Sequence, residues 1–428
     1  MAISLITIFV LAYAAIAFEH VIKINKSASA LIGAGLLWTI YAIALGNPIL
    51  LNEQLSASLV STAQIVFFLM GAMTIVEVVD GHNGFEVITS KIKTKKMSDL
   101  LFLIGGASFI LSSILDNLTT SIIMVSLLPK ILIRREDRLL LSALIIIAAN
   151  AGGAWSPIGD VTTTMLWING HITSLEMIKW LFLPSVVSLL VPVLIASVGL
   201  RGQIVLAPET GEATKHHYKY EGGVMFFLGL GILITVPIFK SATQLPPFMG
   251  ILFGLGLLWL IGDLFYHYKN DREQQPLTLI DALSRIDLSS IVFFIGILLA
   301  VAVLEHSTLL THFAHFLADK LERVDVIVFM TGLASAVVDN VPLVAASMGM
   351  YSLSHYPPND LLWIFLAYCA GTGGSLLVIG SAAGIAAMGL EQIDFFWYMK
   401  KISWLALIGY IAGAATFLLE RYLFQSHF

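Results

Sequence analysis

Apolar runs recur along the whole chain, each about 17 to 25 residues long, and this pattern limits the possible folds more than any other feature. A helix of that length crosses a hydrocarbon core about 30 Å thick. Of the 428 residues, 58% are hydrophobic and 12% are charged. A soluble domain carries about twice that charged fraction. The sequence therefore predicts an all-α, polytopic integral membrane protein.

The apolar segments predict about ten transmembrane helices and two longer excursions. Single spans are expected at about 3–18, 29–45, 58–79, 177–200, 224–239, 248–265, 288–304 and 402–423. Two stretches interrupted by Gly and Pro, 139–167 and 361–388, are each expected to form one discontinuous helix. The two remaining stretches, 100–133 and 324–353, are too long for a single span.

Basic residues set the expected topology, because cytoplasmic loops carry an excess of Lys and Arg. Those expected to face the cytoplasm are Lys23, Lys26, Lys91, Lys93, Lys95, Lys96, Arg134, Arg135, Arg138, Arg201, Lys215, Lys219, Lys269, Arg272, Arg285, Lys400 and Lys401. Stretch 100–133 must then enter and leave from the cytoplasm, and stretch 324–353 from outside. Both termini face out, and 201–223 forms a cytoplasmic linker. We expect the protein in the cell inner (plasma) membrane.

Three short matches suggest an internal duplication. "IVFF" begins at Ile65 and again at Ile291, Asp-Asn occurs at 116 and 339, and Gly-Gly followed by Ile-Gly begins at 152 and 373. With the topology above, the two copies have opposite orientations. The sequence thus predicts two inverted-topology repeats, 1–200 and 224–428, an arrangement that places a transport site near the membrane midplane.

Each long excursion contains polar residues near its middle. "SSILDNLTTS" surrounds Asp116, and "ASAVVDNVPL" surrounds Asp339. As one helix, 100–133 would be about 50 Å long, so a turn is needed near Asp116. Two full spans could meet in a surface turn, or two half-depth helices could form a re-entrant hairpin with a buried tip. Length alone does not separate these two arrangements, and a buried tip would require a cavity.

The two discontinuous helices should expose oxygen atoms at the same depth. In "NAGGAWSPIGDVTTTM", Gly and Pro residues at 152, 153, 157 and 159 are expected to break the helix and free backbone carbonyls. The oxygen-bearing side chains around the two breaks are Asn150, Ser156, Asp160, Thr162, Thr163 and Thr164, then Thr372, Ser375 and Ser381. Such hard ligands suit alkali or alkaline-earth cations. The one cysteine, Cys369, excludes a multi-cysteine metal cluster.

Three aspartates indicate the sign of the transported ion. Asp116, Asp160 and Asp339 would be costly in lipid, so we expect them to face a polar site. Such negative charge favours a small cation over an anion. Protons and the cation would compete for the same carboxylates, and an empty, deprotonated carrier would be too charged to cross cheaply. These properties are sufficient for antiport.

"LDNLTTS" followed by "NAGGAWSPIGDVTTTMLW" resembles the NhaD-type sodium/proton antiporters of the ion transporter superfamily, over essentially the whole chain. The resemblance implies two re-entrant helical hairpins and two discontinuous helices in each protomer, with homodimerisation and elevator-like movement. It also implies exchange of Na⁺ or Li⁺ for H⁺ without a cofactor. With Asp339 from the argument above, the expected cation-site residues are Asp116, Asn117, Asn150, Asp160, Thr162, Thr163, Ser335, Asp339, Asn340, Thr372 and Ser375. The expected partners are small cations, protons and membrane lipid, with no nucleic acid.

Other interpretations remain open from the sequence. Asp116 and Asp160 could simply cap half-helices. A related transporter could move an oxyanion or carboxylate with cation coupling, which a basic residue at a hairpin tip would favour, and neither tip sequence contains one. An intramembrane aspartyl protease also needs two membrane aspartates. However, "SPIGD" has Pro157 where the Gly-x-Gly-Asp motif has its first glycine.

Overall fold

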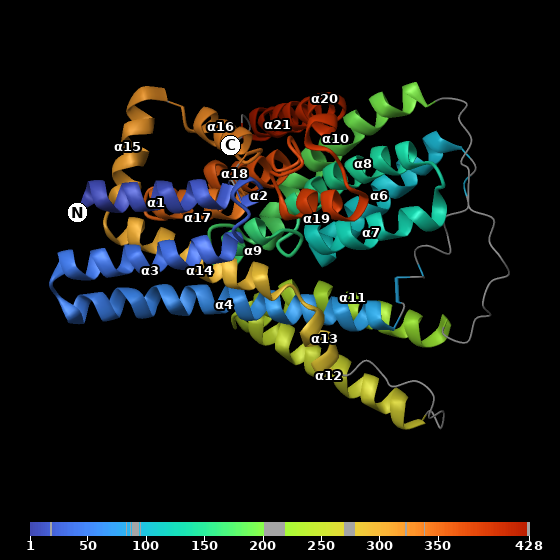
Figure 1. Cartoon of the computed structure of the whole chain (residues 1–428), viewed down its shortest axis with the longest axis horizontal. Helices are drawn as coiled ribbons and strands as arrows, with labels where there is room; N and C mark the ends of the chain where they lie inside the picture. The colour runs from blue at the N-terminus through green and yellow to red at the C-terminus, as the bar shows by residue number, and fades with distance from the viewer. Residues whose placement is uncertain are drawn as a thin grey trace.

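A computed structural model describes residues 1–17, 19–82, 84–85, 87, 94, 96–200, 219–268, 279–321, 323–337 and 339–425. Within these ranges the regular elements are helices, and no extended strand occurs. Many of the long helices run along the long axis of the molecule (Figure 1). The predicted all-α, polytopic fold is confirmed.

Nine helices in the described ranges are long and apolar enough to cross a membrane. They are α3 (Lys26–Leu45), α4 (Pro48–Gly81), α6 (Met97–Leu115), α8 (Arg135–Ala154), α10 (Ser174–Gly199), α11 (Lys219–Thr243), α12 (Pro247–Tyr268), α14 (Leu288–His306) and α21 (Ser403–Gln425). The shorter helices are α1 (Ala2–Ala17), α2 (Glu19–Ile22), α7 (Asn117–Ile131), α9 (Val161–Ile168), α13 (Leu279–Arg285), α15 (Leu309–Leu321), α16 (Val324–Ala334), α17 (Asn340–Met350), α18 (Leu361–Gly373), α19 (Ala382–Glu391) and α20 (Phe395–Lys401).

These nine helices are not the same set as the expected ten crossings. Helix α6 is among the nine, although the sequence places it in a hairpin. Conversely, α1 has only 16 residues, and neither α18 nor α19 alone is long enough to count as a membrane-crossing helix. The expected linker 201–223 lies outside the described residues up to position 218. The division into two repeats around it stays a prediction.

Helix α4 begins ten residues before the expected span of 58–79, because its first turn carries strong start signals. Asn47 accepts hydrogen bonds from the backbone N–H groups of Ile49 and Leu50, both at 3.2 Å. Pro48 follows at the first helical position, where its missing N–H costs nothing. Over 34 residues the helix is about 51 Å long, so it must tilt or extend beyond the hydrocarbon core.

The helices stop close to the predicted turns and breaks. Stretch 100–133 forms α6 and α7, which meet at Asp116, and stretch 324–353 forms α16 and α17 with Asp339 just before the second helix. We call these pairs the first and second hairpins. The two broken stretches form α8 with α9 and α18 with α19. Whether each hairpin re-enters from one membrane face stays a prediction.

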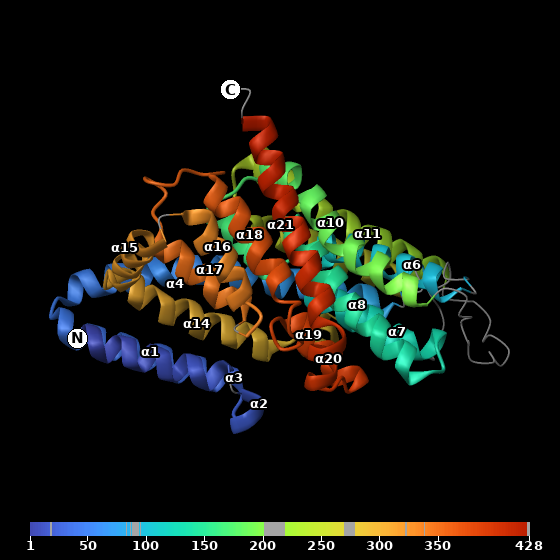
Figure 2. The same ribbon diagram turned by 90° about the horizontal axis from the view of Figure 1, so that it is seen from above.

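Each hairpin packs against both broken helices, its own and that of the other half of the chain. The first hairpin contacts α8 along both arms, and its α7 also lies against α19 (Figure 2). The second hairpin contacts α18 along both arms, and its α17 lies against α9. The short helix after each break therefore packs on the other half's hairpin, and the two halves enclose one common interior.

Glycines allow the close helix contacts that form this interior. A Cβ atom on Gly152 would lie 2.2 Å from the carbonyl oxygen of Phe109 in α6, and one on Gly373 would lie 2.0 Å from that of Gly332 in α16. Helix α8 continues through Gly152 and Gly153 and ends only at Ala154. The expectation that these two glycines break the helix is therefore wrong, because their role is to let α8 approach its neighbours.

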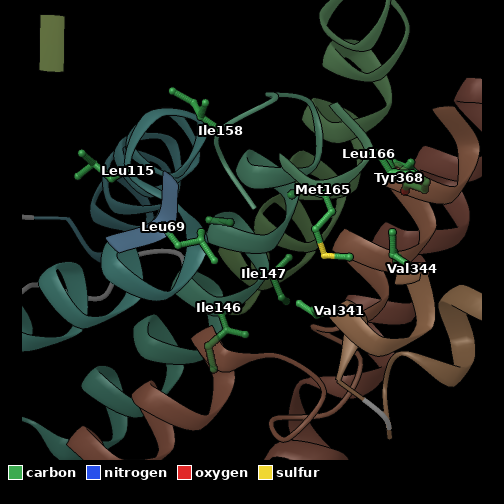
Figure 3. Packing of buried hydrophobic residues seen from close by; sticks show 14 of the residues in the cluster. Leu69, Leu115, Ile146, Ile147, Ile158, Met165, Leu166, Val341, Val344 and Tyr368 are labelled. Carbon is green, nitrogen blue, oxygen red and sulfur yellow. The ribbon is translucent and has the colours of Figure 1, made fainter. Parts of the chain in front are cut away.

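The apolar core surrounds the breaks. Figure 3 shows buried side chains from α4, α6, α8, α9, α17, α18 and the break between α8 and α9 close to one another, namely Leu69, Leu115, Ile146, Ile147, Ile158, Met165, Leu166, Val341, Val344 and Tyr368. Polar groups inside this core cannot rely on bulk water, so they must find partners within the protein. Their hydrogen bonds define the candidate site.

Candidate functional site

Asp160 lies between the two parts of the first broken helix and is only 2% exposed. Its carboxylate caps α9 by accepting hydrogen bonds from the N–H of Thr162 at 2.9 Å and from the hydroxyl of Thr162 at 2.8 Å. The capping that the sequence allowed is therefore present. It uses one carboxylate oxygen, Oδ1, for both bonds, and the second oxygen points to other groups.

An asparagine from each hairpin tip contacts the carboxylate of Asp160. Asn117 Nδ2 donates to Asp160 Oδ2 at 2.6 Å, and Asn340 Nδ2 lies 3.3 Å from the same oxygen and 3.4 Å from Oδ1. Asn117 begins α7 and Asn340 begins α17, so the two side chains come from equivalent positions. Hydrogen bonds to a charged acceptor are roughly twice as strong as neutral ones. Asp160 thus connects the two halves of the chain.

The same network reaches the second break. Asn117 Nδ2 also donates to Asn150 Oδ1 at 3.0 Å, and Asn150 Nδ2 donates to Ser381 Oγ at 3.0 Å. Ser381 caps α19 by accepting from the N–H of Gly384, as Asp160 caps α9. We call Asp160, Asn117, Asn340, Asn150 and Ser381 the Asp160 network. All five residues are buried.

Asp116 lies beside this network in an unusual backbone conformation, with φ 92° and ψ 162°. That region is open essentially to glycine alone and costs about 1–3 kcal/mol for other residues. Its carboxylate caps α7 through the N–H of Thr119 at 2.7 Å and the hydroxyl of Thr119 at 3.0 Å. Local strain of this kind persists only where the surrounding packing enforces it.

A small cavity joins the two aspartates of the first half. It has a volume of about 10 Å³ and is lined mostly by apolar residues, with Asp116, Asp160 and Thr164 as the polar residues of the lining. A space of this size holds about one water molecule or one small ion. Among the ion pairs of the described residues, none involves Asp116 or Asp160. The cavity is therefore bounded by two carboxylates without a basic partner.

Asp339 has different surroundings. It caps α17 by accepting from the N–H of Val341 at 3.3 Å, and its Oδ2 lies 3.3 Å from the ammonium nitrogen of Lys26 in α3. From the sequence, Lys26 has only a topological role, and neither the spacing nor the motif around it signals this contact. Asp339 is the predicted site aspartate that the structure pairs with a base.

The remaining predicted hydroxyls hold the broken backbone. They donate to carbonyl oxygens, Thr163 to Asp160, Ser335 to Ala370, Thr372 to Tyr368 and Ser375 to Thr372, over 2.6 to 2.9 Å. These side chains lie around the breaks without joining the Asp160 network. Ser381, which the sequence analysis places around the second break but not among the cation-site residues, joins the network as the cap of α19. The available sequence signal for this role is the position of Ser381 after the Gly-rich segment.

The donor set suits a hard cation. In the described part of the chain, no three His, Cys, Asp or Glu side chains come together as a metal cluster. A cation in the cavity would meet the side-chain oxygens of Asp116, Asp160 and Thr164. Alkali cations bind such oxygen ligands, whereas soft transition metals prefer thiolate or imidazole.

Comparison with known proteins places the chain in a family. The sequence model of the citrate transporter family, CitMHS, matches residues 13–371. Sodium/proton antiporter 1 of Arabidopsis thaliana is 47% identical over 97% of this chain and 72% of its own length. The Na⁺/H⁺ antiporters NhaD of Alkalimonas amylolytica and Vibrio cholerae are 29% and 28% identical over 96% of this chain, and over 89% and 90% of their own lengths. The chain is thus a multi-pass membrane transporter and not an enzyme, and it belongs to the NhaD-type sodium/proton antiporter family.

Proposed function

We propose that this protein exchanges Na⁺ or Li⁺ for H⁺ across the membrane by alternating access. The observation that carries the proposal is the meeting of both hairpin tips on Asp160, beside an ion-sized cavity that Asp116 also lines. The names of the relatives, sodium/proton antiporters, support it. The exchange requires no cofactor, because both transported species bind the same side chains.

Competition for Asp116 and Asp160 couples the two ions. A cation is held when the carboxylates are charged, and protons that neutralise them release it. The empty and fully charged site is expensive to move through lipid, so the protein changes its exposure only when it is loaded with the cation or with protons. Asn117 and Asn340 keep Asp160 in place during both halves of the cycle.

Alternating access is proposed to move the hairpins and broken helices together. The mutual packing of α7 with α19 and of α17 with α9 supports a single mobile unit. The proposal includes two inverted repeats, 1–200 and 224–428, with re-entrant hairpins and the cavity near the midplane. It also includes elevator-like motion, a homodimer and a location in the plasma membrane, on which the resemblance to bacterial NhaD proteins bears.

A cation-coupled carboxylate transporter is the alternative that the family description "Citrate transporter" raises. Its strongest structural support is Lys26, a base at the second hairpin tip. That charge is already matched by Asp339, and the cavity itself has two further carboxylates. A carboxylate substrate would meet net negative charge there. Cation exchange therefore fits the site better.

The test uses everted membrane vesicles from an antiporter-deficient host, energised to an acid interior and followed with a ΔpH-sensitive dye. We expect NaCl or LiCl to restore the dye signal, and choline chloride to have no effect. Asp160→Asn should abolish the response, whereas Asp99→Asn, at an exposed position in the first turn of α6, should retain it. Citrate uptake by the same vesicles, without a response to any cation, would replace antiport by the alternative.

A further inference from the structure

The ion pair between Lys26 and Asp339 joins the N-terminal part of the protein to the second hairpin tip. The two residues are 313 positions apart in the chain. Their side chains are 15% and 13% exposed, so the pair is largely shielded from solvent. The ammonium nitrogen also lies 4.5 Å from the ring centre of Phe293, whose face attracts a cation. Lys26 therefore has a defined place against α14.

Hydrogen bonds also fix the backbone of Lys26. Its N–H donates to Glu19 Oε1 at 3.1 Å, and Asn25 caps the helix that Lys26 begins. The neighbouring Ser27 hydroxyl donates to the carbonyl of Ser289 at 2.7 Å, which fixes the start of α3 to the start of α14. These contacts fix the position from which the Lys26 side chain reaches the second hairpin tip.

A short path leads from this charge to Asp160. Asp339 caps α17, and the next residue, Asn340, donates to both oxygens of Asp160. These two contacts, at 3.3 and 3.4 Å, are longer than the usual N–H···O range of about 2.7–3.2 Å. A small displacement of the tip would remove them. The position of Asn340 therefore depends on what holds Asp339.

We propose that Lys26 is a positioning residue, the fixed counter-charge that holds Asp339 so that Asn340 reaches Asp160. In this role Asp339 binds Lys26 and does not bind the transported cation. The proposal rests on the proposed function, because it assigns a part in the Asp160 site. It also gives the two aspartates of the hairpin tips different roles.

Removing one partner of a shielded ion pair leaves an uncompensated charge, which is more disruptive than removing both. Lys26→Met would free the Asp339 carboxylate to move, and Asp339→Asn would leave an unmatched ammonium close to the site. In the double variant neither charge remains. The amide oxygen of Asn at 339 can still accept from the N–H of Val341, so the tip keeps its cap.

The experiment measures Na⁺ binding and exchange separately on Lys26→Met, Asp339→Asn, the double variant and Lys26→Arg. Binding is read from the Na⁺-dependent rise in the thermal unfolding temperature of the purified protein. We expect each single neutralisation to raise the half-maximal Na⁺ concentration on the order of tenfold, and the double variant to recover most of that loss. Lys26→Arg should stay close to wild type. Lys23→Met, at an exposed position three residues earlier, is the matched control.

Two results would overturn the positioning role. One is an unchanged Na⁺ dependence in Lys26→Met. The other is a double variant as impaired as Asp339→Asn alone, which would make Asp339 a direct cation ligand. Unfolding temperatures without Na⁺ show whether a variant is merely unstable. Na⁺ binding without exchange in wild type would count against antiport alone, whereas no Na⁺ dependence in wild type would overturn both proposals.

Discussion

The first and second hairpins present the same dipeptide, Asp-Asn, at their tips, and the asparagine of each tip reaches the same carboxylate. Asn117 and Asn340 both donate to Asp160. The aspartates differ. Asp116 lines the small cavity and has no ion pair among the described residues, whereas Asp339 pairs with Lys26. Equal residues in equivalent positions thus have unequal electrostatic surroundings.

Backbone conformation separates the two aspartates as well. Asp339 has φ −47° and ψ 135°, an ordinary extended conformation before a helix, while Asp116 has φ 92°. Strain concentrated at one of two equivalent tips indicates that the packing around Asp116 enforces a particular carboxylate position. In the proposed site, the first tip therefore adds the Asp116 carboxylate to that of Asp160, whereas the second tip supports Asp160 through Asn340.

The largest expected effect comes from neutralising the two tip aspartates in turn. Asp116→Asn should reduce Na⁺/H⁺ exchange in everted vesicles to background, because it removes one of the two carboxylates that line the cavity. Asp339→Asn should keep measurable exchange at saturating Na⁺. Equal and complete loss in both variants would show that the tips carry the same role, and that the comparison is wrong.

The close helix contacts should contribute about equally to the stability of the protein in both halves of the chain. Gly152→Ala and Gly373→Ala each bring a Cβ against a backbone oxygen, and we expect each to lower the free energy of unfolding by about 1–3 kcal/mol. Gly106→Ala is the control, since beyond the adjacent backbone of its own helix no atom lies within 4 Å of the added Cβ. Thermal unfolding in detergent measures all three. A tolerated alanine at only one of the two contacts would reveal that the halves pack differently.

Substitution of the two asparagines should weaken the Na⁺ dependence of exchange to different extents. Asn117→Ala loses a 2.6 Å bond to Asp160 and a second bond to Asn150, so we expect the half-maximal Na⁺ concentration to rise by about tenfold or more. Asn340→Ala loses only the longer contacts and should give about a threefold rise. Titration of exchange with Na⁺ at fixed pH provides the measurement. The reverse order would mean that the second tip dominates cation binding.

The smallest effect is expected at the far end of the network. Ser381→Ala removes the acceptor of Asn150 and the cap of α19, at a cost of about 1 kcal/mol in unfolding free energy. The half-maximal Na⁺ concentration should change by less than about threefold, because Ser381 does not contact Asp160. A loss as large as that of Asn117→Ala would instead place Ser381 next to the bound cation.

Much of the helical arrangement could be predicted from local sequence. The expected stretches 100–133 and 324–353 correspond to α6–α7 and α16–α17, because a turn is required wherever an apolar run exceeds one span. The start of α4 was misplaced because the sequence shows apolar length more clearly than capping. Gly152 and Gly153 were misread because a glycine that breaks a helix and one that permits close packing look the same in a single sequence.

By itself, the sequence determined the membrane class, the places where helices break and the polar residues that interrupt the apolar segments. These are local properties, set by hydrophobicity, Gly and Pro within a few turns of helix. Only the tertiary structure decided which of those residues meet. Asn117 and Asn340 reach Asp160 from opposite halves of the chain, and Lys26 finds Asp339 across 313 positions. The partner of a buried charge depends on how helices that are distant in the sequence pack together. A local sequence pattern does not predict that packing.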